Sequence, residues 1–462
     1  MRVTRTGIGI FVLVLLALLW IRPAEAVPSY AVQTGLPCST CHVGSFGPQL
    51  KPFGRQFKLN GYVLSDGQEH DLPPLTFELL TSYTHLASAG AGGKTYGVGQ
   101  TACAACHPGQ FGGSPVPRND VTADSLSLYY AGRVTENIGA FAQVNFDGIS
   151  NSIHWGNIDL RYATTGRLFG EDLVIGIDLN NNPTVQDLWN TTPQWTFPFA
   201  QSQLARTPAA ATLIDGALAQ TVGGAGVYAQ WNDLLYVEFA GYHDIGVDAR
   251  DSLGITPASG QNILSGVAPY WRVALQHSMG SHDFELGTYG ILTHDYPTDV
   301  RTFGTDRFTD IAFDAQYQYI PSDDFNLGVY ATYIDERERF GASHQLIFSQ
   351  PTDRLQTWRA NVSASWEDTY TLNARYFVDI GTTDATIFGT ETGSPNSAGY
   401  IVEVDWAPNG KPGASFLPNW LNVKFSAQYV GYTRFNGQVA GASSNNDIFF
   451  SAWWAVPLNG GW

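Results

Sequence analysis

The sequence has few charged residues and little sulfur. Asp, Glu, Lys and Arg make up 14% of the 462 residues, against roughly 25% in soluble globular domains. The chain has only four Cys and two Met, and no long apolar run follows its first residues, which excludes a bundle of membrane-spanning helices. Basic residues are the minority, and the net charge of −17 makes nucleic acid and anionic lipid headgroups poor partners.

Aromatic residues and glycine are abundant instead, with 13% aromatics and 49 Gly. A chain that is poor in charge, rich in both of these and only moderately hydrophobic is typical of a membrane β-barrel. Its lipid-facing and lumen-facing residues alternate, so the mean hydropathy conceals the membrane face. The composition therefore favours a transmembrane barrel over a soluble domain.

The first 26 residues have the pattern of a secretory signal. Arg2 and Arg5 precede an apolar stretch over 8–20, and Ala24-Glu25-Ala26 follows with the small-x-small pattern of a cleavage site. An uncleaved anchor helix is the alternative, but the apolar stretch is shorter than a comfortable membrane span. We expect residues 1–26 to be removed and the protein to be exported.

All four cysteines lie in two Cys-x-x-Cys-His runs, CSTCH at 38–42 and CAACH at 103–107. Two thiols at this spacing can bond the two vinyl groups of one haem, and the adjacent His can bind its iron. The pattern predicts two covalent haem c groups. Their attachment and proximal ligand residues would be Cys38, Cys41, His42, Cys103, Cys106 and His107.

Three other interpretations account for part of this pattern. Two disulfides would explain an even cysteine count in an exported protein, and thioredoxin-like pairs would explain the Cys-x-x-Cys spacing. Neither explains a His directly after both pairs, and no βαβ pattern surrounds them. A Cys₄ zinc site would have to bridge 60 intervening residues.

The sixth ligand of each iron must come from elsewhere in the chain. Outside the signal the only methionine is Met279, so at most one haem can have His/Met coordination, and a second His or an open position is expected for the other. Three histidines are distal candidates: His70, His85 and His154.

A short segment, 27–71, holds the first motif and the run FGRQFKLNGY at 53–62. About 45 residues cannot bury much core unaided, so we expect a haem to supply the apolar centre, or a larger structure to enclose the segment. Arg55 and Lys58 are candidates for pairing with haem propionates, and a solvated basic turn is the alternative.

From residue 72 onward we expect a barrel, because apolar and polar residues alternate with period two from about Leu75. Tyr400, Val402, Val404 and Trp406 alternate with Ile401, Glu403 and Asp405, for example. A water-soluble all-β protein is the alternative, but aromatic residues near the strand ends favour a membrane. The pattern predicts a closed antiparallel barrel of about sixteen strands. They are expected at 75–86, 123–134, 138–147, 155–164, 171–180, 220–231, 233–243, 267–279, 282–293, 308–319, 323–335, 353–366, 368–379, 397–406, 419–434 and 446–457.

The connections predict the orientation. Those after even-numbered strands are short, apart from 407–418, and short turns are periplasmic in outer-membrane barrels. The segment 27–71 would therefore lie on the periplasmic side or plug the lumen. The second motif would lie in the long loop 87–120, at the opposite end of the barrel, so that two redox centres bracket the membrane.

The N-terminal pattern also resembles a known family. The run Ala31-Val32-Gln33-Thr34-Gly35, then CSTCH, then Pro48-x-Leu50-x-x-Phe53-Gly54-Arg55-x-Phe57-Lys58-x-x-Gly61-Tyr62 is similar to the start of the fused cytochrome–porin family, the outer-membrane iron oxidases. The resemblance covers some 35 residues. It implies a haem plug, held by Cys38, Cys41 and His42, inside a sixteen-stranded barrel. It also implies electron flow from extracellular Fe(II) to a periplasmic cytochrome. Members of that family carry one haem motif, so the second motif here is a departure.

Three functions are compatible with these patterns: electron transfer across the outer membrane, a dihaem peroxidase, and a diffusion porin with a structural haem plug. A peroxidase would require a largely helical soluble fold. For the first function, acidic loop residues are candidates for concentrating Fe(II), a solvated rim being the alternative. They are Asp147, Asp244, Asp248, Asp295, Asp299, Asp335, Glu336 and Glu338.

Overall fold

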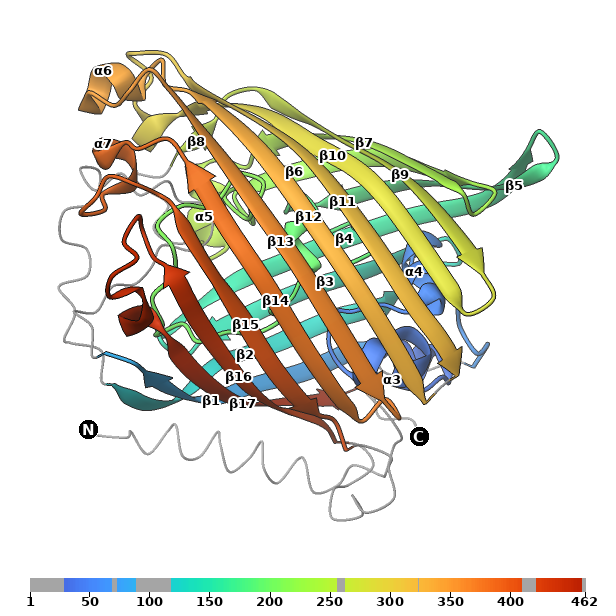
Figure 1. Ribbon diagram of the computed structural model, residues 1–462. Helices are drawn as coiled ribbons and strands as arrows, with labels where there is room; N and C mark the ends of the chain where they lie inside the picture. The colour runs from blue at the N-terminus through green and yellow to red at the C-terminus, as the bar shows by residue number, and fades with distance from the viewer. Residues whose placement is uncertain are drawn as a thin grey trace, which may run out of the picture.

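A computed structural model of the chain describes residues 29–68, 73–88, 118–255, 262–322, 324–408 and 421–458. Its strands form one sheet in which β1 (Leu75–Leu86) pairs with both β2 (Asn119–Arg133) and β17 (Asp447–Pro457), so that the sheet closes on itself (Figure 1). All the strand pairs are antiparallel. Sixteen long strands make the wall, and the extra one, β8 (Ile263–Leu264), is a two-residue strand beside β10. The predicted fold class is confirmed.

The remaining strands follow one another around the barrel in chain order. They are β3 (Ile138–Asp147), β4 (Ser152–Leu168), β5 (Glu171–Asn180), β6 (Val222–Trp231), β7 (Leu235–Asp244), β9 (Val267–Met279), β10 (His282–Tyr296), β11 (Asp306–Ser322), β12 (Phe325–Arg339), β13 (Thr352–Trp366), β14 (Tyr370–Gly381), β15 (Ser397–Trp406) and β16 (Asn422–Arg434).

Helices are short and lie outside the wall sequence. Among the residues described, none is long and apolar enough to cross a membrane. They are α2 (Ser29–Thr34), α3 (Cys38–Cys41), η1 (Val43–Ser45), α4 (Pro52–Leu59), η2 (Pro193–Trp195), α5 (Val247–Ser252), η3 (Pro297–Asp299), α6 (Ser343–Ile347), α7 (Ala385–Phe388) and η4 (Ala442–Asn445).

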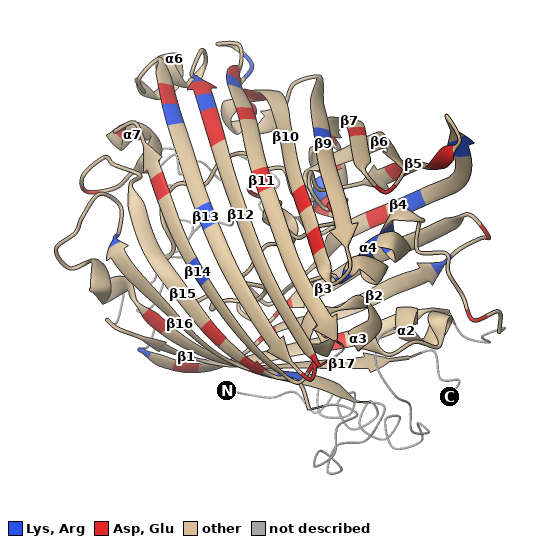
Figure 2. Cartoon of the chain, turned by 45° about the vertical axis from the view of Figure 1, so that its right-hand side comes forward, with Lys and Arg blue, Asp and Glu red and all other residues tan. Residues whose placement is uncertain are grey.

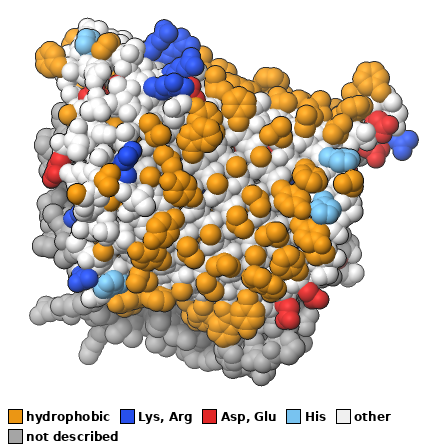
Figure 3. Space-filling view, viewed as in Figure 1, with side chains coloured by type: hydrophobic (Ala, Val, Ile, Leu, Met, Phe, Trp, Pro, Cys, Tyr) orange, Lys and Arg blue, Asp and Glu red, His pale blue; other side chains and the backbone are white. Residues whose placement is uncertain are grey.

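The alternating strand residues divide as the sequence predicts. On β15, Tyr400, Val402 and Val404 face outward, while Glu403 and Asp405 are buried on the lumen side. The outer face carries apolar side chains over most of the wall (Figure 3). Many charged residues lie along the strands (Figure 2), and most of those in the wall are buried on the lumen side. An apolar exterior around a polar interior is the arrangement of a transmembrane β-barrel and not of a soluble one.

Aromatic side chains form a band on the outside near one end of the barrel. Trp406 stacks on Phe425 with ring centroids 5.4 Å apart, and Phe425 lies 5.9 Å from Trp454. Phe325 and Trp366 continue the band at 5.8 Å. Rings of this kind mark the membrane interface in outer-membrane barrels, which confirms the expected aromatic belt.

The two ends of the barrel differ in their connections. One end, here called the turn end, carries the tight connections 134–137, 169–170, 232–234, 280–281 and 367–369, together with the longer 407–421. The other end, the loop end, carries the connections 181–221, 245–262, 340–351, 382–396 and 435–446, and the short 148–151. The predicted asymmetry is confirmed, and the 407–421 connection is long as expected.

Two segments are inserted into the lumen. The N-terminal segment 29–66, here called the plug, enters at the turn end, where α3 and α4 lie (Figure 1). The segment 181–221, here called the inserted loop, comes from the loop end. Asn190 joins the two, because its side-chain NH₂ donates to the Pro48 carbonyl (2.8 Å) and its oxygen accepts from the Leu50 N–H (2.9 Å).

The plug is fixed to the wall by polar contacts on several strands. The Arg55 guanidinium pairs with Asp283 of β10 and donates to Gln318 of β11 (2.7 Å). Lys51 pairs with Asp368 at 2.9 Å. Other bonds run from Ser29 to Thr76 (2.9 Å), from Tyr62 to Asp159 (2.6 Å) and from Tyr228 to the Leu59 carbonyl (2.7 Å). The segment that is too short to fold alone is therefore enclosed by the barrel.

Candidate functional site: a haem-type cavity in the plug

Local geometry positions the first Cys-x-x-Cys-His run. Cys38–Cys41 forms the single turn α3, and His42 leaves it in an extended conformation that pairs with Leu50. The chain then returns as α4, and the Lys51 N–H donates to the Cys41 carbonyl (2.8 Å). Gly54 lets the two helices meet, since a Cβ there would lie 2.5 Å from the Cys41 carbonyl oxygen.

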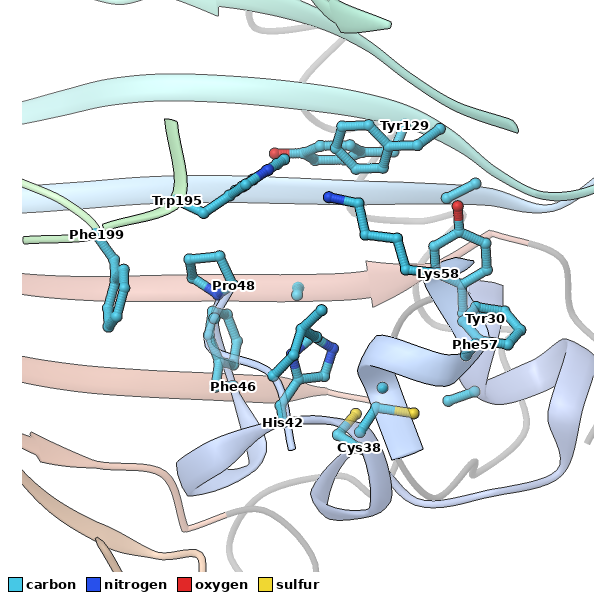
Figure 4. Close-up of a pocket in the computed structure, with 18 of the residues that line it drawn as sticks. Tyr30, Cys38, His42, Phe46, Pro48, Phe57, Lys58, Tyr129, Trp195 and Phe199 are labelled. Carbon is cyan, nitrogen blue, oxygen red and sulfur yellow. The ribbon is translucent and has the colours of Figure 1, made fainter. Parts of the chain in front are cut away.

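Both cysteines and His42 line one cavity of about 400 Å³ (Figure 4). The plug contributes Phe46 and Phe57, and the inserted loop contributes Trp195 and Phe199. The barrel wall completes the cavity with residues of β1, β2, β3, β16 and β17. Its volume falls in the range of roughly 300–1,000 Å³ that small-molecule and cofactor sites occupy, and its mainly apolar and aromatic lining is usual for them.

The His42 ring is prepared to act as a ligand. Burial lowers the pKa of His42 to about 4, so the imidazole is neutral at ordinary pH, which is the form that binds a metal. The backbone groups of Gln49 and Gly47 lie beside the ring and act against the effect of burial on its pKa. A buried, neutral imidazole on a cavity wall can bind a metal through one ring nitrogen while the other faces backbone.

The cysteines behave as attachment points rather than as reactive thiols. Cys38 and Cys41 are not joined in a disulfide. Burial raises the pKa of Cys41 to about 11, whereas thioredoxin-like pairs lower the pKa of their nucleophile. Within the described ranges no three His, Cys, Asp or Glu side chains are grouped to hold a metal ion. The disulfide and thioredoxin alternatives are therefore disfavoured for this motif.

These observations fit haem c. Cys38 and Cys41 would form the thioethers and His42 would bind the iron, while the apolar cavity would receive the porphyrin. The second motif, Cys103, Cys106 and His107, lies outside the described residues, as do the signal segment 1–26 and His70. The described part of the chain therefore brings the residues of one of the two motifs together on a single cavity.

The other distal candidates do not reach this cavity. His85 lies seven residues beyond the cavity residue Glu78 on β1, about 23 Å at the ordinary strand rise, and its ring bonds to Asn119 (2.6 Å). His154 lies opposite Asn145 on β4 and is not part of the cavity lining. Met279, which is 61% exposed at the end of β9, is absent from it too.

Lys58 lines the cavity together with His42. Its ammonium donates to the carbonyls of Val185 and Asp187, both at 2.7 Å, and lies 5.0 Å from the centre of the Trp195 ring. Burial lowers the pKa of Lys58 to about 7. Lys58 thus remains a candidate for contact with the bound group. Arg55 is not such a candidate, because it pairs with Asp283 and is absent from the cavity lining. Both side chains are buried, so neither forms the solvated basic turn considered as the alternative.

Sequence reasoning missed the inserted loop as part of the site. The run WNTTPQWTFPF at 189–199 lies between two predicted strands, and its Trp195 and Phe199 line the cavity. Four large aromatic residues in eleven positions are unusual for a water-exposed loop. This density of aromatic residues is the feature of the sequence that predicts a buried run.

Several of the acidic candidates for Fe(II) are engaged within the fold. Asp244 pairs with Arg250, Asp299 with Arg301, and Asp335 with both Arg337 and Arg354. Glu336 accepts from the Leu213 N–H of the inserted loop. Much of the acidic set is therefore structural, and the solvated rim considered as the alternative holds for Asp248, which is exposed.

The fold and the site define a class: a transmembrane β-barrel with an N-terminal plug that carries a haem-attachment motif in the lumen. No family model matches the chain, and no curated protein matches it.

Solved structures with similarity include OmpT of Vibrio cholerae (11% identity, TM-score 0.40, covering 82% of this chain and 96% of that one). Others are the channel DcaP of Acinetobacter baumannii (10%, 0.43, 82% and 96%) and an anion-selective porin from Comamonas acidovorans (10%, 0.41, 83% and 98%). At these identities and TM-scores the similarities say nothing about what this chain binds or conducts.

Proposed function

We propose that the protein is an outer-membrane c-type cytochrome that moves electrons across the membrane through its barrel. The observation that carries the proposal is the cavity inside the barrel, on which Cys38, Cys41 and the buried, neutral ring of His42 meet. A porin needs no such set, and a soluble peroxidase would not have an apolar outer wall. The helical fold required by the peroxidase alternative is contradicted by the barrel.

The chain's own residues hold the group and shield it. Cys38 and Cys41 fix its position covalently, and His42 sets the ligand on one face. Phe46, Phe57 and the aromatic residues of the inserted loop give the cavity an apolar lining. When bound, haem c supplies a one-electron Fe(III)/Fe(II) couple. An enclosed apolar setting of this kind is one of the means by which a protein sets such a potential.

The difference between the two ends of the barrel defines the proposed direction of electron flow. In the proposed orientation the turn end and the plug face the periplasm, as short turns do in outer-membrane barrels. The loop end then faces outside and carries the second motif, Cys103, Cys106 and His107. We take Fe(II) as the extracellular donor and a periplasmic cytochrome as the acceptor, both implied by the resemblance of the plug sequence to the cytochrome–porin family.

The first test is a haem count on the full-length protein purified from outer membranes. Mass and absorbance should give two haems for the wild type, one for C38A/C41A and one for C103A/C106A. Ser39→Ala and Thr40→Ala, which change only the residues between the first two thiols, should keep two. A wild-type protein without covalent haem would refute the proposal.

The second test places the protein in liposomes that contain a trapped c-type cytochrome. Fe(II) added outside should reduce the trapped cytochrome in the wild type and much more slowly in C38A/C41A. Planar-bilayer recordings serve as the counter-test. Open-pore conductance together with an oxidised trapped cytochrome would favour the porin with a structural haem plug. We expect little conductance, because the plug and the inserted loop both occupy the lumen.

A further inference from the structure

One of the apolar clusters inside the barrel is mainly aromatic and lies between the cavity and the loop end. It is here called the aromatic series and consists of Phe199, Phe197, Phe377, Tyr432 and Phe435, packed together with three smaller apolar residues. These smaller residues are Ile401, Val430 and Ala442.

Each step of the aromatic series is a packed contact. Phe199 lines the cavity, and its ring centre lies 5.7 Å from that of Phe197. Phe197 packs in the same cluster as Phe377 of β14, whose ring lies 5.8 Å from Tyr432 of β16. Tyr432 lies 4.9 Å from Phe435, in the loop that follows β16. Ring contacts thus join Phe199 to Phe197, and Phe377 to Tyr432 and Phe435, and the two groups belong to one apolar cluster between the cavity wall and the loop end.

The route spans much of the barrel. Asn422 at the start of β16 lines the cavity, and Tyr432 lies ten residues further along the same strand, about 33 Å at the ordinary strand rise. Phe199 also lines the cavity, so the series covers only the part of this length between Phe199 and the loop end. Electron transfer in a single step falls off steeply with distance, and it falls off less steeply through packed side chains than through water or empty space.

Polar side chains surround the aromatic series on the strands that carry it. Lumen-facing neighbours on the same strands are charged or amide side chains: Arg375 and Asp379 on β14, Glu403 on β15, Lys424 and Gln428 on β16. Lysine and arginine also flank the rings, with Lys424 5.7 Å from Phe199 and Arg375 5.7 Å from Phe197. The series is buried among polar groups and excludes water along its length.

The loop-end terminus of the series is structurally anchored. The Tyr432 N–H donates to Asn446 Oδ1 (2.8 Å), and the Ala87 N–H donates to the Asn446 carbonyl (2.9 Å). Ser88 donates to the Ser444 carbonyl (2.8 Å). The connection that leaves β1 therefore starts directly beside the last rings of the series.

We infer that the aromatic series is the electronic coupling route between the loop end and the haem cavity. The inference rests on the proposed function. With haem bound in the cavity, a one-electron donor at the loop end would go from Fe(II) to Fe(III), and the ferric haem iron would take up that electron. No bond would form or break, and the rings would keep their ordinary oxidation state and serve as the packed medium through which the electron tunnels.

The test measures transfer inside the haem-loaded full chain. A photoactive ruthenium complex is attached at V439C, because Val439 is 63% exposed and lies four residues after Phe435. A flash then injects one electron, and haem reduction is followed by absorbance. Phe377→Leu, which keeps an apolar side chain but removes the ring, should slow reduction by at least about tenfold. Tyr432→Leu should also slow it, while Tyr432→Phe should keep the wild-type rate.

The matched control is Tyr242→Leu. Tyr242 is also a fully buried lumen tyrosine in aromatic contact, with its ring 6.1 Å from Tyr270, but it belongs to a different cluster. Y242L should leave the rate unchanged. The haem midpoint potential of each variant is titrated as well, and it should not move, because the series changes coupling and not driving force.

The outcomes separate the inference from the function on which it rests. Equal reduction rates in F377L, Y432L and wild type would overturn the coupling route and leave the cytochrome assignment intact. A rate loss in Y242L as large as in F377L would also overturn it, since any cavity in the lumen would then have the same effect. A protein without covalent haem would instead refute the proposed function.

Discussion

The ion pair between Arg55 and Asp283 offers a sharp test of how the plug is held. Both side chains are buried, at 4% and 6% exposure, so solvent screens their attraction little. Asp283→Asn keeps the shape of the side chain but leaves the guanidinium without its carboxylate. Breaking a buried pair in this way typically costs about 3–5 kcal/mol. The ratio of docked to undocked plug should fall by about two to three and a half orders of magnitude.

Hydrogen exchange of the full-length protein in detergent measures this loss directly. Amides of α4 should exchange faster in D283N, while amides of β13 and β14, which do not contact Arg55, should keep their protection. The double variant R55M/D283L, which replaces the pair by apolar residues, should regain most of the α4 protection. Unchanged α4 exchange in D283N, or a double variant no better than D283N, would refute the reasoning.

Three further predictions concern the cavity and the wall. Gly54→Ala should cost about 1–3 kcal/mol of plug stability through overpacking against the Cys41 carbonyl and should lower the haem content per chain. Gly166→Ala on β4, which has open space around it and no positive φ, should not lower it. Equal haem content in both variants would contradict the close helix contact. Burial lowers the pKa of Lys58 to about 7, so this side chain is positively charged below that pH and neutral above it. Because the loss of a nearby positive charge favours the oxidised haem, the haem midpoint potential should fall as pH rises through 7. In Lys58→Met the potential, measured by potentiometric titration, should stay flat. Val402→Arg on the outer face should destabilise the barrel by about 2–4 kcal/mol near the membrane midplane, and equilibrium unfolding from lipid vesicles that leaves it as stable as wild type would place β15 outside the membrane.

The strand pattern could be predicted closely because a single constraint governs every wall residue. A lipid-facing position must be apolar and a lumen-facing one polar, so the period of two is visible in the letters. The bounds of β1, β3, β5, β9 and β15 agree with prediction to the residue. The predicted lengths of β4 and β11 are too short. The ends of these strands extend past the wall, where side chains no longer have to alternate between lipid and lumen.

The site was predictable only in its covalent part. Cys38, Cys41 and His42 follow from local spacing, since attachment chemistry requires neighbouring residues. The walls of the cavity come from Trp195, more than 150 positions away, and from β16 and β17. Their approach depends on barrel closure and on long-range bonds such as that of Asn190 to the Leu50 N–H, which no local pattern encodes. For the same reason the sequence did not reveal that His85 ends far from the cavity.

Barrel closure sets an order of events for making this protein. The seam that completes the cylinder joins β1 to β17, the first strand to the last, and Cys38 packs against Ala455 of that last strand. Once the seam has formed, the thiols lie behind a finished wall. For the proposed cytochrome, we therefore expect haem to be attached before the final strand joins the sheet, so that the chain reaches barrel assembly with its cofactor in place.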